Sequence, residues 1–256
     1  MANLQTAERC SQNEASDNVV FQRHLFAYEQ AAALISGTVA EVGCGEGYGM
    51  RILLPKSELY VAMDKYPSKV GKEQAEKLIF KQMNFPDFGG VPINFFDFII
   101  CFQVVEHIEA DELFIKKMSG LLKQGGKLIL TTPNVLMSLT RNPFHVREYA
   151  YSELDALIRP FFSKTDIRGV FGKQQATDYF EANKASVARF RRLDPFDFEH
   201  RLPAVILKMP YDLLNRWNRR KLLKNLNTET ISVTTEEFYL DAFAPNAYDF
   251  FVVAEK

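Results

Sequence analysis

The chain is 256 residues long, 47% of its residues are hydrophobic, and its formal net charge is −1. That apolar content can bury a full core, so we expect one domain with an elaboration, or one and a half domains. The near-zero net charge excludes a general electrostatic attraction to nucleic acid or to an anionic membrane.

Neither a targeting segment nor a membrane span is expected. The opening stretch Met1–Arg9 lacks a basic region followed by an apolar one, and no apolar run approaches the ~18 residues that a span needs. The three cysteines, Cys10, Cys44 and Cys101, show neither metal-ligand spacing nor a disulfide framework. We therefore expect a cytoplasmic protein with reduced thiols.

Strands alternate with helical stretches along the chain, which is typical of a parallel sheet with helices on both faces. An amphipathic helix over Phe21–Ile35 comes first and is ended by Gly37. Gly125 and Gly126 are expected to stop a later helix. The predicted strands are 38–43, 59–63, 78–83, 95–102, 127–132, 164–170 and 248–254, and the predicted later helices are 68–77 and 111–122. This order predicts an α/β fold with a doubly wound, seven-stranded, mostly parallel sheet.

A long stretch over 171–228 is mostly helical, aromatic and basic, and the sheet does not need it. It is too long for a structureless loop, so we predict a helical cap or insertion. Its aromatic side chains must be buried, either over a ligand pocket or between the two chains of a homodimer. The expected division is therefore an N-terminal helical segment over the cofactor site (1–36), a core (37–170 and 229–256) and the helical insertion.

The stretch Val39–Gly49 reads as a buried strand that runs into a glycine loop, whose backbone N–H groups can approach a ligand closely. A second apolar strand ends in Asp64, 21 positions after Gly43, about where a nucleotide fold places the carboxylate that binds ribose hydroxyls. Tyr48 fills the third glycine slot of a dinucleotide pattern, which disfavours a dehydrogenase. The pattern E-x-G-x-G-x-G that begins at Glu41 instead resembles motif I of the class I S-adenosylmethionine-dependent methyltransferases.

This resemblance covers roughly residues 20–170 and the final strand, and it is closest to small-molecule methyltransferases of ubiquinone and menaquinone biosynthesis. Besides motif I and Asp64, it rests on four short stretches: Phe96-Asp97, Glu106-His107-Ile108, Gly125-Gly126 and Thr132-Pro133-Asn134. It implies a Rossmann-like sheet whose last strand is antiparallel. It also implies S-adenosyl-L-methionine as cofactor and S-adenosyl-L-homocysteine as product.

The resemblance assigns roles in the motif I region. Gly43, Gly45 and Gly47 would line the methionine moiety, and Glu41 would bind its ammonium group directly or through water. Asp64 would hold the ribose. The alternative is an ordinary tight turn with a surface acid.

Further roles follow from the strands beyond. Lys65 would pack beside the adenine, Asn84 would reach the adenine amino group, and Phe85 would donate its backbone N–H. Many relatives carry Asp where this chain has Asn84, but an amide oxygen can still accept that bond. Gln103 should lie beside the sulfonium; for it and Asn84 the alternative is turn capping. Two side chains of the first helix resemble residues that fold over the cofactor in relatives, with plain packing as the alternative: His24 and Tyr28.

A polar segment over Asn142–Tyr149 lies beyond the fifth predicted strand, at the sheet edge where ligands bind in open α/β folds. His145 suits a general base that removes a hydroxyl proton during methyl transfer. Positioning alone can also suffice, in which case the segment is structural. Arg147 would then pair with Glu148 or Glu153.

Two absences narrow the chemistry. The fourth strand ends without Asn/Asp-Pro-Pro-Tyr, which disfavours methylation of adenine in nucleic acids, and no acid follows it as in metal-dependent catechol-type enzymes. No metal is expected. The interpretation is an S-adenosylmethionine-dependent methyltransferase that acts on a small molecule, with oxygen as the acceptor atom. The alternatives are an RNA or protein methyltransferase, which the basic helices would serve, and a non-catalytic S-adenosylmethionine-binding protein.

Overall fold

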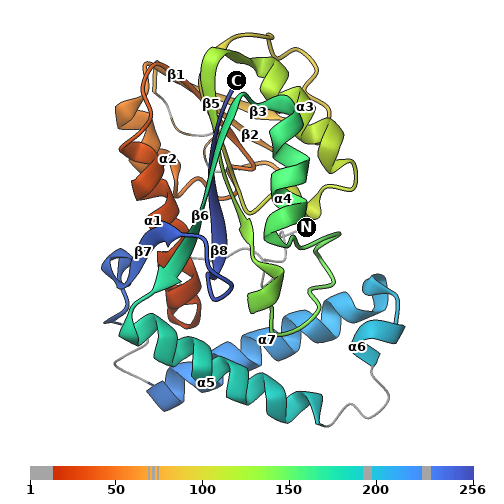
Figure 1. Cartoon of the computed structure of the whole chain (residues 1–256). Coiled ribbons are helices and arrows are strands. Elements are labelled where there is room, and N and C mark those ends of the chain that lie inside the picture. Colours follow the sequence, from red (N-terminus) through yellow and green to blue (C-terminus); the bar gives the residue numbers. More distant parts are fainter. Residues whose placement is uncertain (1–13, 69, 71–72, 74, 193–197, 227–231) are drawn as a thin grey trace. The chain divides into compact units, whose positions relative to one another are not determined.

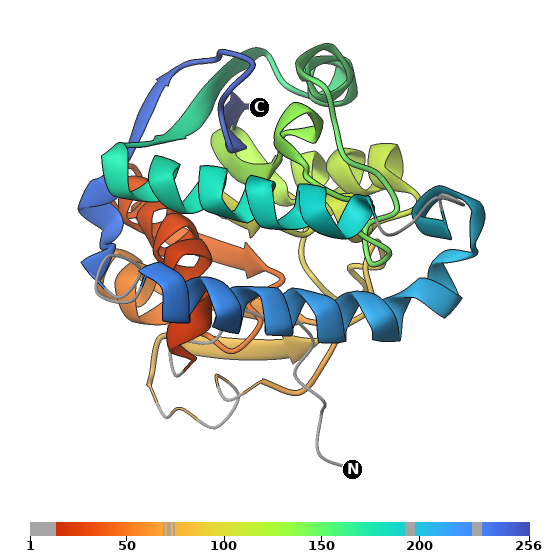
Figure 2. The same ribbon diagram turned by 90° about the horizontal axis from the view of Figure 1, so that it is seen from below.

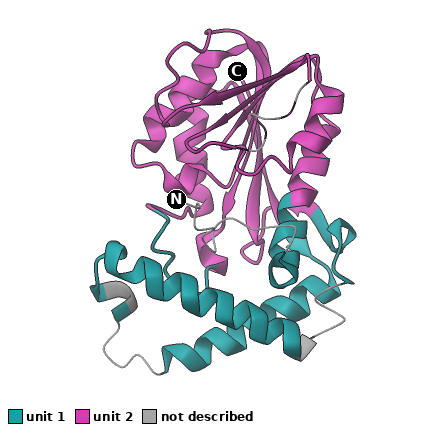
Figure 3. Cartoon of the chain, turned by 180° about the vertical axis from the view of Figure 1, so that it is seen from behind, with its two compact units in different colours: residues 1–24, 138–145, 171–239 teal, residues 25–137, 146–170, 240–256 magenta. Residues whose placement is uncertain are grey.

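The computed structural model of the chain describes residues 14–68, 70, 73, 75–192, 198–226 and 232–256. The chain divides into two compact units (Figure 3). We call residues 25–137, 146–170 and 240–256 the sheet unit, and residues 1–24, 138–145 and 171–239 the helical unit.

An eight-stranded sheet has the strand order β3-β2-β1-β4-β5-β8-β6-β7. The strands are β1 (Thr38–Val42), β2 (Leu59–Asp64), β3 (Leu78–Gln82), β4 (Phe96–Phe102), β5 (Leu122–Pro133), β6 (Lys164–Gly172), β7 (Phe238–Ala242) and β8 (Asp249–Glu255). The pairs β1–β2, β1–β4, β2–β3 and β4–β5 are parallel, whereas β8 is antiparallel to both β5 and β6. The α/β fold with an antiparallel last strand is thus confirmed, and β7 adds an eighth strand to the seven predicted.

Helices cover both faces of the sheet. The described α-helices are α1 (Asn18–Ala32), α2 (Met50–Leu53), α3 (Asp111–Leu121), α4 (Tyr151–Ile158), α5 (Gln174–Arg191), α6 (Phe198–Arg201) and α7 (Ala204–Leu226). Within the sheet unit, α2 and the part of α1 from residue 25 lie on one face, and α3 and α4 lie on the other (Figure 1).

The core of the sheet unit explains why its inner strands read as continuous apolar runs. In β1 every residue from Val39 to Val42 is buried, as expected for a parallel strand covered on both faces. On the α3 face, Phe114 and Met118 pack with Ile99 of β4 and Leu128 of β5, all fully buried. Full burial of each such side chain contributes about 1.5–3 kcal/mol.

Two local predictions were wrong. Gly125 and Gly126 do not stop α3; they lie in an irregular part of β5, where the register to β4 shifts between Phe96 and Phe98. The helix ends earlier because Leu122 takes an extended backbone conformation, with φ −71° and ψ 143°, and begins β5. The helix predicted over 68–77 includes residues 69, 71–72 and 74, which lie outside the described residues, and its described end at 76–77 forms a turn.

In the helical unit, α5 and α7 run side by side (Figure 2). A buried polar contact joins them: Ser186 Oγ donates to Asn218 Oδ1 at 2.6 Å, and Asn218 Nδ2 donates to Asn183 Oδ1 at 2.7 Å. Of the stretch 171–228, predicted to be mostly helical, residues 171–172 belong to β6, and α5, α6 and α7 account for most of its other described residues; 193–197 and 227–228 lie outside them. Among the described helices, none combines the length and apolarity needed to cross a membrane.

Candidate functional site

The sheet unit has one topological switch point. From β1 the chain runs outward to β2 and β3, then returns to the other side of β1 to form β4 and β5. In open α/β sheets, ligands bind beside the carboxyl ends of the strands at such a point. The predicted glycine loop follows β1 there, Asp64 ends β2, and Gln103 follows β4.

The three glycines of the loop differ in what surrounds them. All have a positive φ, +83° for Gly43, +53° for Gly45 and +83° for Gly47. A Cβ at Gly43 or Gly47 would clash with the side chain of Val104 or Val70, whereas a Cβ at Gly45 would meet nothing within 4 Å. Gly43 and Gly47 are therefore required by packing inside the protein, while Gly45 faces open space.

Asp64 is tied directly to that loop. Its carboxylate is buried, and Oδ2 accepts the backbone N–H of Gly45 at 2.8 Å while Oδ1 accepts the N–H of Tyr66, also at 2.8 Å. Each carboxylate oxygen can accept a further bond. The spacing of 21 residues noted in the sequence thus corresponds to a direct contact between loop and carboxylate.

Glu41 lies fully buried beneath the loop, between two tyrosines. Tyr28 Oη donates to Glu41 Oε1 at 2.6 Å, and Tyr60 Oη donates to Oε2. Burial raises the pKa of Glu41, and the two hydroxyl donors only partly offset this. The pKa values of both tyrosines are raised by burial and by the adjacent carboxyl group. Tyr60 was not predicted, and its place inside an apolar strand gave no signal of a polar role.

Tyr28 itself is held by aromatic contacts. Its ring centroid lies 5.5 Å from that of Tyr48 and 4.8 Å from that of Phe102. A Cβ at Gly49 would overlap the Tyr28 ring. The glycine-rich segment thus lets the ring pack close to the loop.

Gln103 has φ +55°, the left-handed region that non-glycine residues rarely adopt. Its backbone N–H donates to Thr131 O at 2.9 Å and its Nε2 to Thr131 Oγ1 at 3.3 Å. Strained backbone of this kind gathers at functional sites. The conformation sets the direction of the side chain at the end of β4.

The residues predicted to contact the adenine lie at the ends of β2 and β3. Lys65 and Asn84 are exposed and Phe85 is partly buried. The Phe85 ring lies 5.3 Å from that of Phe88 and 5.7 Å from that of Phe114, so it is anchored in the core. Asn84 accepts the N–H of Asp87 through its backbone carbonyl.

The residues at this edge fit an adenosyl cofactor. An added Cβ at Gly45 would enter open space, and the Asp64 carboxylate, an acceptor group for hydroxyls, is bonded directly to the Gly45 N–H. Gln103 follows β4, and Asn84 and the Phe85 backbone follow β3, so all three lie at the same edge of the sheet.

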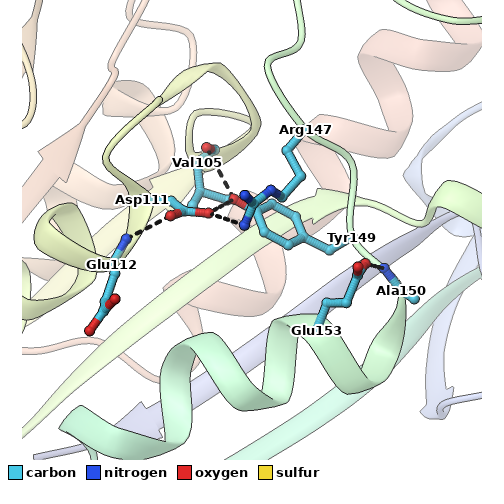
Figure 4. Close-up of polar contacts among 7 residues, drawn as sticks. All are labelled: Val105, Asp111, Glu112, Arg147, Tyr149, Ala150 and Glu153. Atoms are coloured by element: carbon cyan, nitrogen blue, oxygen red, sulfur yellow. Dashed lines mark hydrogen bonds and ion pairs between the residues drawn. The ribbon is translucent and has the colours of Figure 1, made fainter.

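A second polar cluster on the sheet unit holds Arg147 and Tyr149 (Figure 4). Asp111 Oδ2 accepts from both Arg147 Nη1 and Tyr149 Oη at 2.9 Å. The backbone carbonyl of Glu106 accepts the N–H groups of Val146 and Arg147. This cluster gives Arg147 and Tyr149 structural roles. Asp111, 36 positions from Arg147, was not predicted, because sequence spacing carries no signal of such a pair.

Glu153 also differs from the expected pairing with Arg147. Its Oε2 accepts the backbone N–H of Ala150 at 2.8 Å and so stabilises the first turn of α4. Arg147 pairs instead with Asp111.

Two predicted site residues, His24 and His145, belong to the helical unit. Burial and the charges of Arg23 and Arg219 lower the pKa of His24 to about 3, so its imidazole is neutral near pH 7. His145 Nε2 lies 2.8 Å from Asn142 Nδ2. Because Asn142 Oδ1 already accepts the N–H of Phe144, the amide nitrogen donates and Nε2 accepts. His107 is exposed at the end of a short 3₁₀ turn.

Comparison with known proteins identifies the family of the chain. A family model described as a methyltransferase domain matches residues 14–178. A protein of Mycolicibacterium smegmatis named as a probable S-adenosylmethionine-dependent methyltransferase is 31% identical over 175 residues, covering 65% of this chain and 68% of the relative. A ubiquinone biosynthesis O-methyltransferase of Xanthomonas oryzae is 28% identical over 107 residues, covering 40% of this chain and 45% of the relative.

Solved structures show the same fold. A SAM-dependent methyltransferase of Thermotoga maritima aligns with a TM-score of 0.55 at 16% identity, covering 95% of both chains. The chain spans 58 to 68% of the length of the mycobacterial relatives that it matches. It belongs to the methyltransferase-domain family and is, by class, an S-adenosylmethionine-dependent methyltransferase.

Proposed function

We propose that the enzyme transfers a methyl group from S-adenosylmethionine to an oxygen atom of a small molecule, with the cofactor bound over the loop Gly43–Gly47. The observation that carries the proposal is the open space at Gly45 beside a buried carboxylate at the switch point of the sheet. When bound, the cofactor supplies an electrophilic methyl group. The chain's own residues bind it, orient the acceptor and exclude water.

In this proposal the predicted residues keep distinct roles. Gly45 and its neighbours Gly43 and Gly47 form the floor under the methionine moiety, and Asp64 accepts two ribose hydroxyls. The Glu41 carboxyl, fixed by Tyr28 and Tyr60, supports the loop from below and presents negative charge towards the ammonium group. The pair of tyrosine donors explains how a carboxyl group is accommodated in a fully buried position.

The remaining cofactor contacts lie at the ends of the strands. Gln103 faces the sulfonium from the end of β4, where its left-handed backbone fixes its direction. The adenine is contacted by Lys65, Asn84 and Phe85. His24 is proposed to complete the site as a neutral imidazole.

Oxygen as the acceptor atom is supported by the kind of relatives that match, among them ubiquinone biosynthesis O-methyltransferases. A hydroxyl acceptor must lose a proton, and His145 is the residue proposed to take it. Its Nε2 accepts a bond from Asn142, so that bond must be exchanged for one from the acceptor hydroxyl before His145 takes the proton. We further propose that the segment 171–228 determines which acceptor is used.

A labelling experiment tests the proposal. The purified protein is incubated with methyl-labelled S-adenosylmethionine and, separately, with the small-molecule, RNA and protein fractions of a cell extract. Label should enter the small-molecule fraction, and mass spectrometry of the labelled product should show an O-methyl group. Label in RNA or protein would support the alternative acceptors. Cofactor binding with no transfer to any fraction would support a non-catalytic binding protein.

The role of 171–228 is tested by replacing it with a short glycine–serine linker. Cofactor binding should remain measurable and methylation of the acceptor should be lost. If light scattering shows a dimer turned monomer with activity retained, the segment is an oligomerisation element instead.

A further inference from the structure

The outward face of α7 is apolar in its first half and basic in its second. Its exposed side chains recur every three or four residues, which places them on one face of the helix. Along that face they are Val205, Met209, Leu213, Trp217, Arg220 and Lys224. Val205 is 80% exposed, Met209 74% and Leu213 62%, which is unusual for large apolar side chains gathered on one helix.

The opposite face of α7 packs against α5, which leaves the apolar and basic face exposed. Leu222 and Asn218 are buried, and Asn218 bonds to Ser186 of α5. The helix therefore has its partner on one side already. Packing against α5 fixes which side chains point away.

Charge is concentrated on the same helix. α7 carries six basic residues and one acidic residue, a net charge of +5, although the whole chain has −1. The rest of the chain therefore carries −6. The single acid, Asp212, pairs with Arg216 at 3.1 Å. Arg219 also pairs with Asp17 at 2.8 Å and Arg220 with Glu14 at 3.8 Å, so half of the six basic residues have an acidic partner. Lys221 and Lys224 carry the basic character of the outward face.

An aromatic residue marks the boundary between the two halves. Trp217 is 51% exposed, and Lys221 Nζ lies 5.1 Å from the centroid of its ring. Trp prefers the level of the lipid headgroups, where its ring is partly apolar and its N–H is hydrated. A helix with an apolar stripe, a basic region and Trp between them is typical of helices that lie in a membrane interface.

We propose that the face Val205–Lys224 of α7 docks onto the anionic surface of a lipid bilayer. Met209, Leu213 and their apolar neighbours enter the interface, and Lys221 and Lys224 bind the headgroups. Charge complementarity selects this occupant over a second copy of the chain, because two such faces would bring Lys221 and Lys224 of one chain close to the same basic residues of the other. The proposal requires no spanning helix and does not depend on the acceptor of the methyl group.

Vesicle co-sedimentation with the full chain tests the charge requirement. Vesicles of phosphatidylcholine alone are compared with an equal mixture of phosphatidylcholine and phosphatidylglycerol. The protein should bind the mixed vesicles much more tightly and be released by high salt. Lys221→Glu/Lys224→Glu should weaken binding at least ~25-fold, since each basic contact contributes about fivefold. The matched control Lys56→Glu/Lys116→Glu, which makes the same charge change at exposed positions in the sheet unit, should bind nearly as the unaltered chain.

The apolar requirement has its own pair of variants. Met209→Glu should weaken vesicle binding about tenfold or more, because an apolar side chain no longer leaves water. Ile93→Glu is the control, since Ile93 is 73% exposed in the sheet unit. Equal binding to neutral and anionic vesicles, or equal effects of the two variants, would overturn the proposal. Circular dichroism showing that Met209→Glu unfolds the protein would also overturn it, because the face would then be an internal contact. Light scattering showing that Met209→Glu only converts a dimer to a monomer would overturn it as well, because the face would then be a contact between chains.

Discussion

Replacing Gly45 with alanine should separate ligand binding from fold stability. Gly45 has φ +53°, so an alanine there costs about 1–2 kcal/mol of folding free energy from backbone strain. Nothing lies within 4 Å of the added Cβ, so no clash adds to that cost. The melting temperature should fall by only about 2–8 °C for a chain of this size. The same methyl group would enter the space assigned to the methionine moiety, so affinity for S-adenosylhomocysteine should fall at least tenfold, about 1.4 kcal/mol.

The matched control is Gly90→Ala. Gly90 also has a positive φ, +73°, and open space around an added Cβ, but it lies in the turn after β3 rather than in the loop. It should show a similar loss of stability and unchanged affinity. Gly43→Ala should instead destabilise the fold more than either, because its Cβ would clash with Val104. Thermal unfolding and isothermal titration calorimetry give both quantities; Gly45→Ala with the affinity of the unaltered chain would refute the placement of the cofactor.

Three further variants test other parts of the site. Asp64→Ala should lose two charge-assisted bonds to the ribose, each worth about 1.5–3 kcal/mol gross, and calorimetry showing unchanged affinity would contradict the assignment. His145→Ala should lower turnover by ~10²–10⁴ with cofactor affinity nearly intact if the residue is a base, whereas a loss of folding by thermal denaturation would show a structural role. Tyr149→Phe removes a buried hydroxyl bond to Asp111 at 2.9 Å and should cost about 1.5–3 kcal/mol of unfolding free energy, measured by urea denaturation. The control Tyr66→Phe, at an exposed position, should change the free energy of unfolding little. Equal losses of unfolding free energy in the two variants would show that the bond from Tyr149 to Asp111 does not stabilise the fold.

The inner strands were predictable because the physics that forms them is local. β1, β2 and β4 are largely buried, so they appear as apolar runs, and β1 and β2 are also bounded by glycine or acidic residues. β7 was missed because it is an edge strand in which Phe238 alone is buried, and its sequence shows no such run. Gly125 was predicted to end a helix but lies in an irregular part of β5, because glycine with a positive φ occurs both at helix ends and at strand irregularities.

The site divides in the same way between local and distant determinants. The glycine loop and Asp64 were found because a tight turn and a strand end leave a pattern in sequence. The partners of Glu41 and Arg147 were not, since Tyr60 and Asp111 are brought to them only by the fold. Gln103 lies between these cases: its position after β4 was expected, but its left-handed backbone was not.

A crystal structure of the chain with S-adenosylhomocysteine tests the central claim most directly. The amino-acid portion of the ligand should lie over Gly45, and both ribose hydroxyls should bond to Asp64 at the carboxyl end of β2. A ligand bound at any other edge of the sheet, or one whose ribose hydroxyls make no bond to Asp64, would contradict this placement.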